Sequence, residues 1–416
     1  EAARQREAHP GLRAACGLGC REHEALLEEV FEPWWDHRLP QEALMDSCSM
    51  SKRRYELSFI AAISRGRVLY RCCAKACEPA EVKLGTGKST DLEMLLALVG
   101  EIADAVKLPD MYFLFNIGDQ PFVDKMYWTP VPQFHWVRSH GHWGVPLPNP
   151  FQLKAHFQDM LGDGTDISKH HVPWEKKIPK VFWRGSLSAP DYVVARDLGT
   201  IPRVRLQNLA KRHPDLFDVA ITSVDDELLK RLGKEKLQRL LGDLRQTRHA
   251  NFARELPKYR YLVNVAAVVS AWRLTELLAS GSVLLLQEDS SRELIYEWLT
   301  PWEHFVPVSS GLSDLVAKVQ WLESHQAEAR AIAERGYRHF VARVRRQDTY
   351  CYLWQALRAM AAAQEPTRPP KEPDMLRKQG WSEVKPASVA AVAPRHTTLS
   401  KLIKAGAGPA HKAQEL

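Results

Sequence analysis

Between residues 111 and 308 the sequence repeats one unit, a short apolar run followed by a stretch with helical periodicity. Strands that are apolar on both faces and alternate with helices are typical of a parallel sheet covered by helices. The repeat therefore predicts an α/β fold. The predicted strands cover residues 111–117, 180–186, 261–269, 281–287 and 304–308.

Other patterns precede and follow this repeat. Helical periodicity covers residues 24–35 and 91–105, and a hairpin with its turn at Arg65–Gly66 covers 55–72. The segment LGTGKST at 84–90 lacks the spacing of a phosphate-binding P-loop, so we expect an ordinary loop there. From residue 365 the chain is rich in Pro, Ala and Lys, which predicts a flexible tail over 365–416.

Composition and charge narrow the function classes. The net charge of +7 is spread over 416 residues, whereas a nucleic-acid-binding protein gathers Lys and Arg on one face, so we expect no nucleic-acid partner. No apolar run reaches the roughly 18 residues of a transmembrane segment. The seven cysteines include no C-x-x-C pair, which disfavours zinc. They fit either disulfides in a secretory lumen or reduced thiols in a cytosolic protein.

Polar residues at predicted strand ends are the first candidates for a site, because ligands bind beyond the carboxyl ends of parallel strands. Asp119 follows the strand 111–117, where partial burial would suit a general base, although a turn-forming Asp is the commoner explanation. Arg184, Gly185 and Ser186 end the strand 180–186. A guanidinium, a closely approaching backbone and a hydroxyl suit a phosphate group.

Two connections between a strand and a helix carry further arginines. Ser270 and Arg273 lie where the strand 261–269 turns into a helix, with Arg273 expected in the first helical turn. Arg203 and Arg205 open another helix in a comparable position. The amides and partial positive charge of a helix N-terminus suit a diphosphate, while a surface arginine is the plainer alternative.

The stretch from 134 to 151 is rich in Trp and His. Its aromatic and imidazole side chains could stack on a sugar or peptide acceptor, and an ordinary packed loop fits equally well. The candidate acceptor residues are His135, Trp136, His142 and Trp143.

Together these segments resemble the Rumi-like protein O-glucosyltransferases and fungal capsule-associated transferases of glycosyltransferase family 90. LPDMYFLFNIGDQP, KVFWRGS, PRVRLQNLAKRHPDLFDVAIT and KYRYLVNVAAVVSAWRLTELLASGSVLLLQ follow one another in the family's order and spacing. The resemblance implies that Asp119 is the catalytic base and that Arg203 and Arg273 bind the donor diphosphate. The residues that it places at the donor also include Arg184, Gly185, Ser186, Arg205, Val268, Val269, Ser270, Ala271 and Trp272. Where several relatives have Asp-Gly, this chain has Val265–Ala266–Ala267.

The resemblance further implies a GT-B architecture, in which two Rossmann-like α/β domains face each other across a cleft. We place the acceptor-side domain with Asp119 in residues 1–170 and the donor-nucleotide domain in 171–364, whose last helices could cross back to the first domain. The expected reaction is inverting, metal-independent transfer of glucose or xylose from a UDP-sugar to a protein serine or a glycan, without a cofactor, in the endoplasmic reticulum or Golgi lumen. The alternative is an inactive module that binds sugar or protein.

Overall fold

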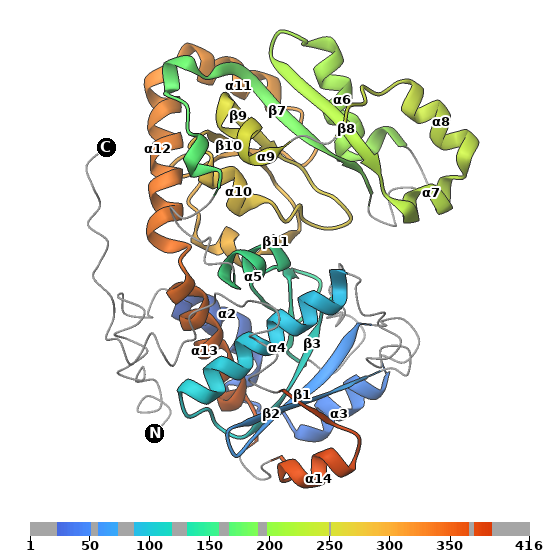
Figure 1. The fold of residues 1–416 in the computed structure, drawn as a ribbon, viewed down its shortest axis with the longest axis vertical. Coiled ribbons are helices and arrows are strands. Elements are labelled where there is room, and N and C mark those ends of the chain that lie inside the picture. Colours follow the sequence, from blue (N-terminus) through green and yellow to red (C-terminus); the bar gives the residue numbers. More distant parts are fainter. Residues whose placement is uncertain are drawn as a thin grey trace. The chain divides into compact units, whose positions relative to one another are not determined.

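The computed structural model describes residues 23–50, 57–73, 87–118, 131–157, 166–189, 198–248, 251–365 and 370–384. The chain divides into two compact units (Figure 1). The first unit comprises Glu1–Asp159 and Arg345–Leu416, and the second comprises Met160–Val344. Within the described residues, no helix is long and apolar enough to cross a membrane.

The second unit is built on a five-stranded parallel sheet in the order β12-β10-β9-β7-β8. Its strands are β7 (Ile178–Leu187), β8 (Phe217–Val224), β9 (Tyr259–Asn264), β10 (Val283–Gln287) and β12 (Val306–Val308). The parallel strands predicted from the apolar runs are thereby confirmed. The largest difference in boundary is at β9, which ends at Asn264, so that residues 265–269 form a loop. β8 was not among the predicted strands.

Helices cover both faces of this sheet (Figure 1). Alternate strand residues supply two separate cores, so that Val181 and Trp183 pack in one and Phe182 in the other. The first core includes side chains of α6 (Pro202–Arg212) and α11 (Leu315–Ser324), and the second includes α10 (Leu274–Ala279) and η11 (Leu294–Trp298). α10 ends before Gly281, whose φ of +63° is the left-handed conformation expected after a helix.

The remaining elements of the second unit lie outside the sheet, and the longest of them is the helix α12. They are η7 (Ser168–His170), η8 (Trp174–Lys176), η9 (Leu198–Thr200), α7 (Asp226–Leu232), α8 (Lys234–Gly242), α9 (Phe252–Glu255), η10 (Leu256–Lys258), β11 (Ser291–Glu293) and α12 (Gln326–Arg343).

The first unit contains a mixed sheet in the order β13-β2-β1-β3-β4-β6. β1 (Ser58–Ser64) and β2 (Arg67–Cys72) form the predicted hairpin. Arg65 and Gly66 both have positive φ, as a tight hairpin turn requires. β3 (Met111–Asn116) runs antiparallel to β1 and parallel to β4 (Gln133–His135), which is parallel to β6 (Gly144–Pro146). The sheet of this unit is therefore mixed, because a tight hairpin can join only antiparallel strands.

The helices of the first unit come from both ends of the chain. They are α2 (Glu24–Phe31), η3 (Glu32–Trp34), α3 (Gln41–Met50), α4 (Gly87–Ala105), α5 (Pro150–Phe157), α13 (Arg346–Ala363) and α14 (Pro373–Lys378), and β5 (Val137–Ser139) is a further short strand. α4 begins at Gly87, so the loop expected at 84–90 is wrong for residues 87–90. A disulfide joins Cys48 of α3 to Cys73, just after β2.

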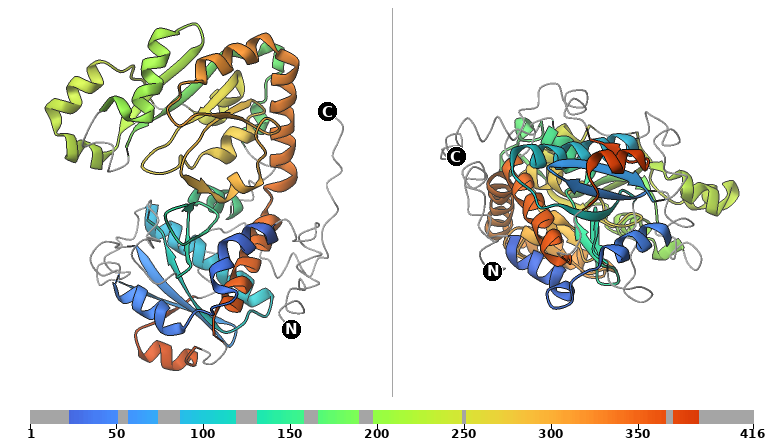
Figure 2. Two further views of the ribbon diagram at one scale, coloured as in Figure 1. Left: turned by 180° about the vertical axis from the view of Figure 1, so that it is seen from behind. Right: turned by 90° about the horizontal axis from the view of Figure 1, so that it is seen from below.

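Part of the expected tail is ordered. Residues 373–378 form the helix α14 (Figures 1 and 2). β13 (Ser382–Glu383) pairs antiparallel with β2. Leu376 and Trp381 are buried, and Trp381 packs against Tyr112 at a ring distance of 5.9 Å. The prediction of a flexible tail is therefore wrong for these residues, because a few buried side chains and one strand pair hold a segment whose sequence lacks periodicity.

Candidate functional site

The strand order of the second unit defines a switch point between β7 and β9. From β7 the chain proceeds to β8 on one side of the sheet, and all later strands lie on the other side. In doubly wound sheets a ligand binds in the crevice outside the carboxyl ends of the two strands at such a point. The segments that leave these two strands therefore form the candidate site.

The end of β7 contains a bulge, and Arg184 beside it makes separate contacts through its side chain and its backbone. The register of β7 against β8 shifts between Gly185 and Ser186. The Arg184 guanidinium donates to the Asp218 carboxylate at 2.8 Å and to the Asp218 carbonyl at 2.7 Å. The carbonyl of Arg184 accepts a hydrogen bond from Arg273. The backbone of Arg184 thus lies at the switch point, whereas the positive charge of its side chain is compensated by the Asp218 carboxylate of β8.

Asp218 is the anchor for the Arg184 side chain. Its carboxylate also accepts hydrogen bonds from Arg245 and from the Tyr259 hydroxyl, each at 2.6 Å. Burial alone would raise the pKa of Asp218, but the hydrogen bonds from Tyr259, Arg184 and Arg245 outweigh it and hold this pKa below its usual range. The carboxylate therefore stays ionised and compensates the charge of Arg184.

Gly185 lies where no side chain fits. A Cβ at this position would approach Trp183 Cζ2 to 2.7 Å and Arg273 Nη2 to 3.2 Å. The glycine predicted at the strand end therefore lets the backbone pass directly beside the Arg273 guanidinium.

Arg203 is buried in the first turn of α6, with 3% of its surface exposed. Its Nη1 donates to the Ser186 carbonyl at 2.6 Å and lies 3.2 Å from the Ser186 hydroxyl, and its Nε donates to the Ala266 carbonyl at 3.1 Å. The guanidinium also lies over the Trp183 ring. Arg203 thus ties the end of β7 to the loop that follows β9.

Arg273 directly precedes α10 and is not in its first turn as expected, because the segment from Val265 to Arg273 is an irregular loop. The Arg273 side chain is half-buried, and its guanidinium lies 5.1 Å from the ring centre of Phe252. Arg184, Ser186, Arg203 and Arg273, which are far apart in the sequence, are thereby brought together at the switch point.

The two guanidinium groups of Arg203 and Arg273 share one electrostatic property. Among the described residues, no carboxylate forms an ion pair with either, and both donate hydrogen bonds to carbonyl or hydroxyl oxygens. Burial, and then the charge of Arg273, lowers the pKa of Arg203 to about 9, against an opposing effect of Asp225. Burial lowers the pKa of Arg273 as well, against an opposing effect of Glu276. Buried cations without an anion are costly, so the site favours a negatively charged ligand.

Unpartnered polar atoms lie at the same sheet edge. The Ser270 hydroxyl is buried and has no hydrogen-bond partner. The same holds for the Ser188 hydroxyl, just beyond β7, and for the Asn264 side-chain oxygen at the end of β9. Ser188 and Asn264 were not among the predicted site residues. Ser188 lies just beyond a predicted strand end, whereas Asn264 was placed inside the predicted strand 261–269, which in the structure ends at this residue. Such atoms can bind a ligand at little desolvation cost.

The other predicted donor residues lie in or near the same loops. Val269 and Ala271 are buried, Val268 and Trp272 are half-buried, and the Ala267 amide donates to the Val269 carbonyl at 2.7 Å. Arg205 projects from α6 in another direction than Arg203, since its Nε donates to the Gly199 carbonyl at 3.2 Å. A Cβ on Gly311, beyond β12, would lie 3.5 Å from Arg205.

Asp119 lies outside the described residues, which reach Gly118 on this side. The strand before it is firmly held. Asn116 donates to the Ser58 hydroxyl at 2.7 Å and accepts from the Gly118 amide at 2.7 Å. The Trp136 indole donates to the Ile117 carbonyl at 3.1 Å. The role of Asp119 as a base stays a prediction from the sequence.

The four candidate acceptor residues separate into two pairs. His135 and Trp136 are fully buried, and His135 Nδ1 lies within 3.1 Å of the Val137 amide. His142 and Trp143 are half-buried before β6, where His142 contacts the Ser139 hydroxyl at 2.7 Å. Only His142 and Trp143 offer surface that a ligand could contact.

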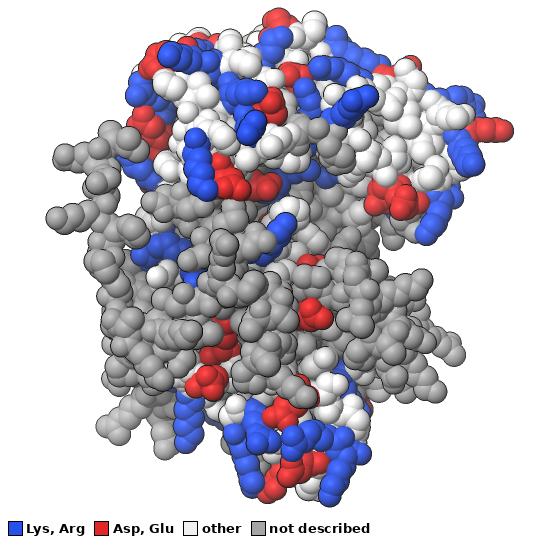
Figure 3. Space-filling view, viewed as in Figure 1, with Lys and Arg blue, Asp and Glu red and all other residues white. Residues whose placement is uncertain are grey.

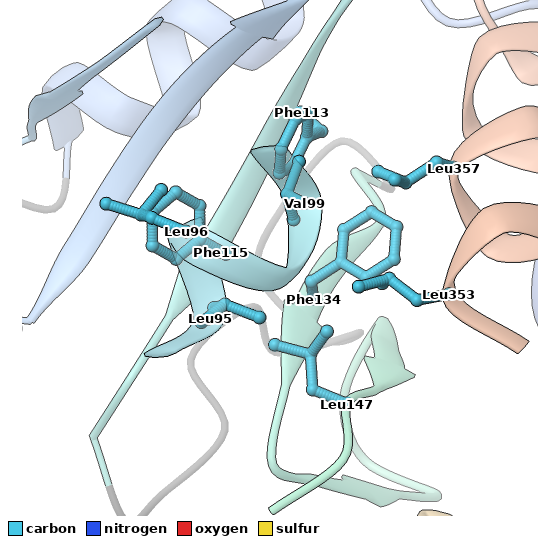
Figure 4. Close-up of a pocket in the computed structure, with 9 residues that line it drawn as sticks. All are labelled: Leu95, Leu96, Val99, Phe113, Phe115, Phe134, Leu147, Leu353 and Leu357. Atoms are coloured by element: carbon cyan, nitrogen blue, oxygen red, sulfur yellow. The ribbon is translucent and has the colours of Figure 1, made fainter. Parts of the chain in front are cut away.

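An apolar gap in the first unit does not resemble a substrate site. Figure 4 shows side chains from α4, β3, β4 and α13 converging around it. Sugars and nucleotides require polar partners in their sites, and none of the lining residues supplies one. The lining residues are Leu95, Leu96, Val99, Phe113, Phe115, Phe134, Leu147, Leu353 and Leu357.

One face of the second unit shows a mixed distribution of charge. On the face shown in Figure 3, Lys and Arg side chains of the second unit lie among Asp and Glu side chains. Among the residues that the structure describes, no three His, Cys, Asp or Glu side chains are grouped so that they could hold a metal ion.

Comparison with known proteins agrees with the motifs. The sequence pattern of glycosyl transferase family 90 matches residues 25–398, so the chain belongs to this family and the resemblance is confirmed. Protein O-glucosyltransferase 2 of Danio rerio is 31% identical over 265 residues, which are 62% of this chain and 49% of that protein. Protein O-glucosyltransferase 3 of Rattus norvegicus is 30% identical over 288 residues, which are 67% of this chain and 52% of that protein. The chain thus spans about half the length of these relatives.

A solved structure described as a crystal structure of GtfA/B complex aligns with 45% of this chain and 37% of its own at 16% identity. The TM-score of 0.29 is too low to support any argument about the fold.

Proposed function

We propose that this protein transfers glucose or xylose from a UDP-sugar to a hydroxyl acceptor, with inversion and without a metal ion. The observation that carries the proposal is the pair Arg203 and Arg273 at the switch point, neither of which forms an ion pair with a carboxylate of the described residues. Membership of glycosyl transferase family 90 supports the same reaction class.

On the donor side, the two guanidinium groups bind the diphosphate. As the bond between the sugar C1 and the phosphate oxygen breaks, the departing UDP takes the electron pair and gains negative charge. Positioned cations stabilise such developing charge most effectively where water is excluded. The unpartnered Ser270 hydroxyl supplies an additional hydrogen bond.

On the acceptor side, Asp119 removes the proton of the acceptor hydroxyl while its oxygen forms a bond to C1. A single displacement of this kind inverts the configuration and needs one base opposite the leaving group. The hydrogen bonds of Asn116 and Trp136 hold the segment that leads to Asp119. The two units would correspond to the two domains of a GT-B enzyme.

We propose a protein serine or a glycan as the acceptor and a secretory lumen as the compartment. The names of two relatives, which are protein O-glucosyltransferases, support a protein acceptor. The Cys48–Cys73 disulfide supports an oxidising compartment.

A donor screen tests the proposal. The protein is incubated with UDP-glucose, UDP-xylose and UDP-galactose, with and without a folded acceptor domain, in the presence of EDTA, and released UDP is measured. We expect release from UDP-glucose or UDP-xylose that EDTA does not reduce. Binding of UDP without turnover of any donor would instead identify an inactive binding module.

A further inference from the structure

Gln287 is the last residue of β10 and lies between the two neighbouring strands β9 and β12. Its side chain is buried, with 4% of its surface exposed. Its Oε1 accepts a hydrogen bond from the Ala266 amide at 2.8 Å, and its Nε2 donates to the Ser310 carbonyl at 2.5 Å. One side chain therefore connects the loops that follow β9 and β12.

The connection continues to the proposed diphosphate site. The Ala266 carbonyl accepts from Arg203, and Arg203 donates to the Ser186 carbonyl. Gln287 therefore holds Ala266 from one side while Arg203 holds it from the other. Through these contacts the segments following β12, β10, β9 and β7 are joined in one line of hydrogen bonds across the carboxyl edge of the sheet.

We propose that Gln287 is a positioning residue for donor binding, which sets the loop that carries Ser270 and Arg273. The inference rests on the proposed function, since the ligand is the diphosphate of the donor. Gln287 touches the loop and not the site itself, because its two partners are Ala266 and Ser310.

The chemistry of the contact requires an amide. The Ala266 amide needs an acceptor and the Ser310 carbonyl needs a donor, and an amide side chain supplies both at once. An ionised carboxylate supplies only acceptors, whereas a protonated carboxyl group again supplies one of each. This difference makes Gln287→Glu a variant whose fit depends on pH.

Gln364 provides a matched control in the first unit. Its side chain is also buried, accepts from the Tyr112 amide at 3.2 Å and donates to the Tyr112 carbonyl at 2.7 Å. It thus also accepts one backbone hydrogen bond and donates to a backbone carbonyl, with a further donation to the Met360 carbonyl at 3.1 Å, and it lies far along the sequence from the residues of the proposed diphosphate site.

The experiment measures the affinity for UDP by calorimetry between pH 5 and 8 for Gln287→Leu, Gln287→Glu, Gln364→Leu and Gln364→Glu, each relative to the wild type at the same pH. Dividing the dissociation constant of each variant by that of the wild type at the same pH cancels the effect of the titration of UDP itself. For Gln287→Leu we expect about a tenfold loss of affinity at every pH, the size that loss of one or two buried hydrogen bonds produces. For Gln287→Glu we expect near wild-type affinity at low pH and a growing loss as pH rises.

The Gln364 variants are expected to lose thermal stability while their folded fraction binds UDP as the wild type does. The positioning role would be overturned if the affinity of Gln287→Glu relative to the wild type did not change with pH, or if Gln287→Leu bound UDP as tightly as the wild type. If the wild type itself does not bind UDP, the proposed function fails. In that case, hydrogen exchange of the Ala266 amide tests whether Gln287 holds the loop. Equal protection of this amide in Gln287→Leu and the wild type would also overturn the inference.

Discussion

The Arg273 guanidinium donates to the backbone carbonyl of Arg184, while the Arg184 side chain points to Asp218 and is neutralised there. Two arginines in contact thus have different electrostatic states. Arg184 has a carboxylate partner inside the protein, and Arg273 has none among the described residues. The charge of Arg273 is therefore available to a ligand, and that of Arg184 is already compensated.

Replacing Arg273 by Ala should weaken UDP binding. A hydrogen bond to a charged group contributes about 1.5–3 kcal/mol, so we expect roughly a tenfold to hundredfold increase in the dissociation constant. Calorimetry with UDP measures it directly. Arg212→Ala, on the exposed end of α6, is the control and should bind UDP as the wild type does. Equal affinities for Arg273→Ala and Arg212→Ala would rule out the diphosphate role.

Asp119→Asn should abolish sugar transfer and leave UDP affinity close to that of the wild type. The amide cannot accept the proton of the acceptor hydroxyl, whereas the donor site does not involve this residue. Turnover of UDP-sugar and UDP affinity are measured on the same preparation. Asp110→Asn is the matched control, because Asp110 is exposed, lies just before β3 and accepts a hydrogen bond from the Arg65 amide. Turnover by Asp119→Asn at the level of Asp110→Asn would contradict the assignment.

Gly185→Ala should reduce both stability and UDP affinity. The added Cβ would clash with Trp183 and crowd Arg273, and overpacking of this kind costs about 1–3 kcal/mol. Chemical denaturation and calorimetry measure the two effects. Gly242→Ala serves for comparison, since a Cβ there would meet no atom within 4 Å. If Gly185→Ala and Gly242→Ala have the same free energy of unfolding and the same affinity for UDP, the close approach of the β7 backbone to Arg273 is not required.

The second unit should lose stability in acid through His339. Its ring lies 4.0 Å from that of His304, and burial, then His304 and then Arg343 lower the pKa of His339 to about 4. Because this pKa is below that of the unfolded chain, the unfolded state binds the proton first, and stability falls as pH decreases from about 6.5 towards 4. Burial lowers the pKa of His304 as well, against an opposing effect of Glu303, so its protonation acts in the same direction.

His339→Phe keeps an aromatic ring and removes the titrating group. Its unfolding temperature should change less between pH 7 and pH 4.5 than that of the wild type. His170→Phe, at an exposed position of η7, should retain the wild-type pH dependence. An identical loss of stability in acid for the wild type and His339→Phe would show that other groups determine it.

Local patterns in the sequence were sufficient to predict four of the five parallel strands of the second unit, all except β8, and the candidates at their ends. Strand-end residues meet at one sheet edge, which is why Ser186, Arg203 and Arg273 could be grouped before their contacts were known. The direction of a side chain depends on the neighbouring strand, so the pairing of Arg184 with Asp218 could not be predicted. The end of β9 at Asn264 was missed because the apolar run continues through Val269 into a loop that is itself partly buried.

Contacts between distant segments account for the other differences. Gln287 ends an apolar run like any polar residue, and only the positions of Ala266 and Ser310 reveal what it holds. The short elements α14 and β13 have little intrinsic preference and form because Trp381 is buried and β2 offers an unpaired edge. No local pattern carries that information.

The first unit includes both early and late parts of the chain, whereas Met160–Val344 is contiguous. On the ribosome, the second unit therefore emerges complete while the first still lacks α13, α14 and β13. The hairpin β1–β2 must wait through the synthesis of an entire sheet before β13 can cover its edge. Until then an open strand edge is exposed to other chains, which makes the interval before the last segment emerges the period when a chaperone would matter most.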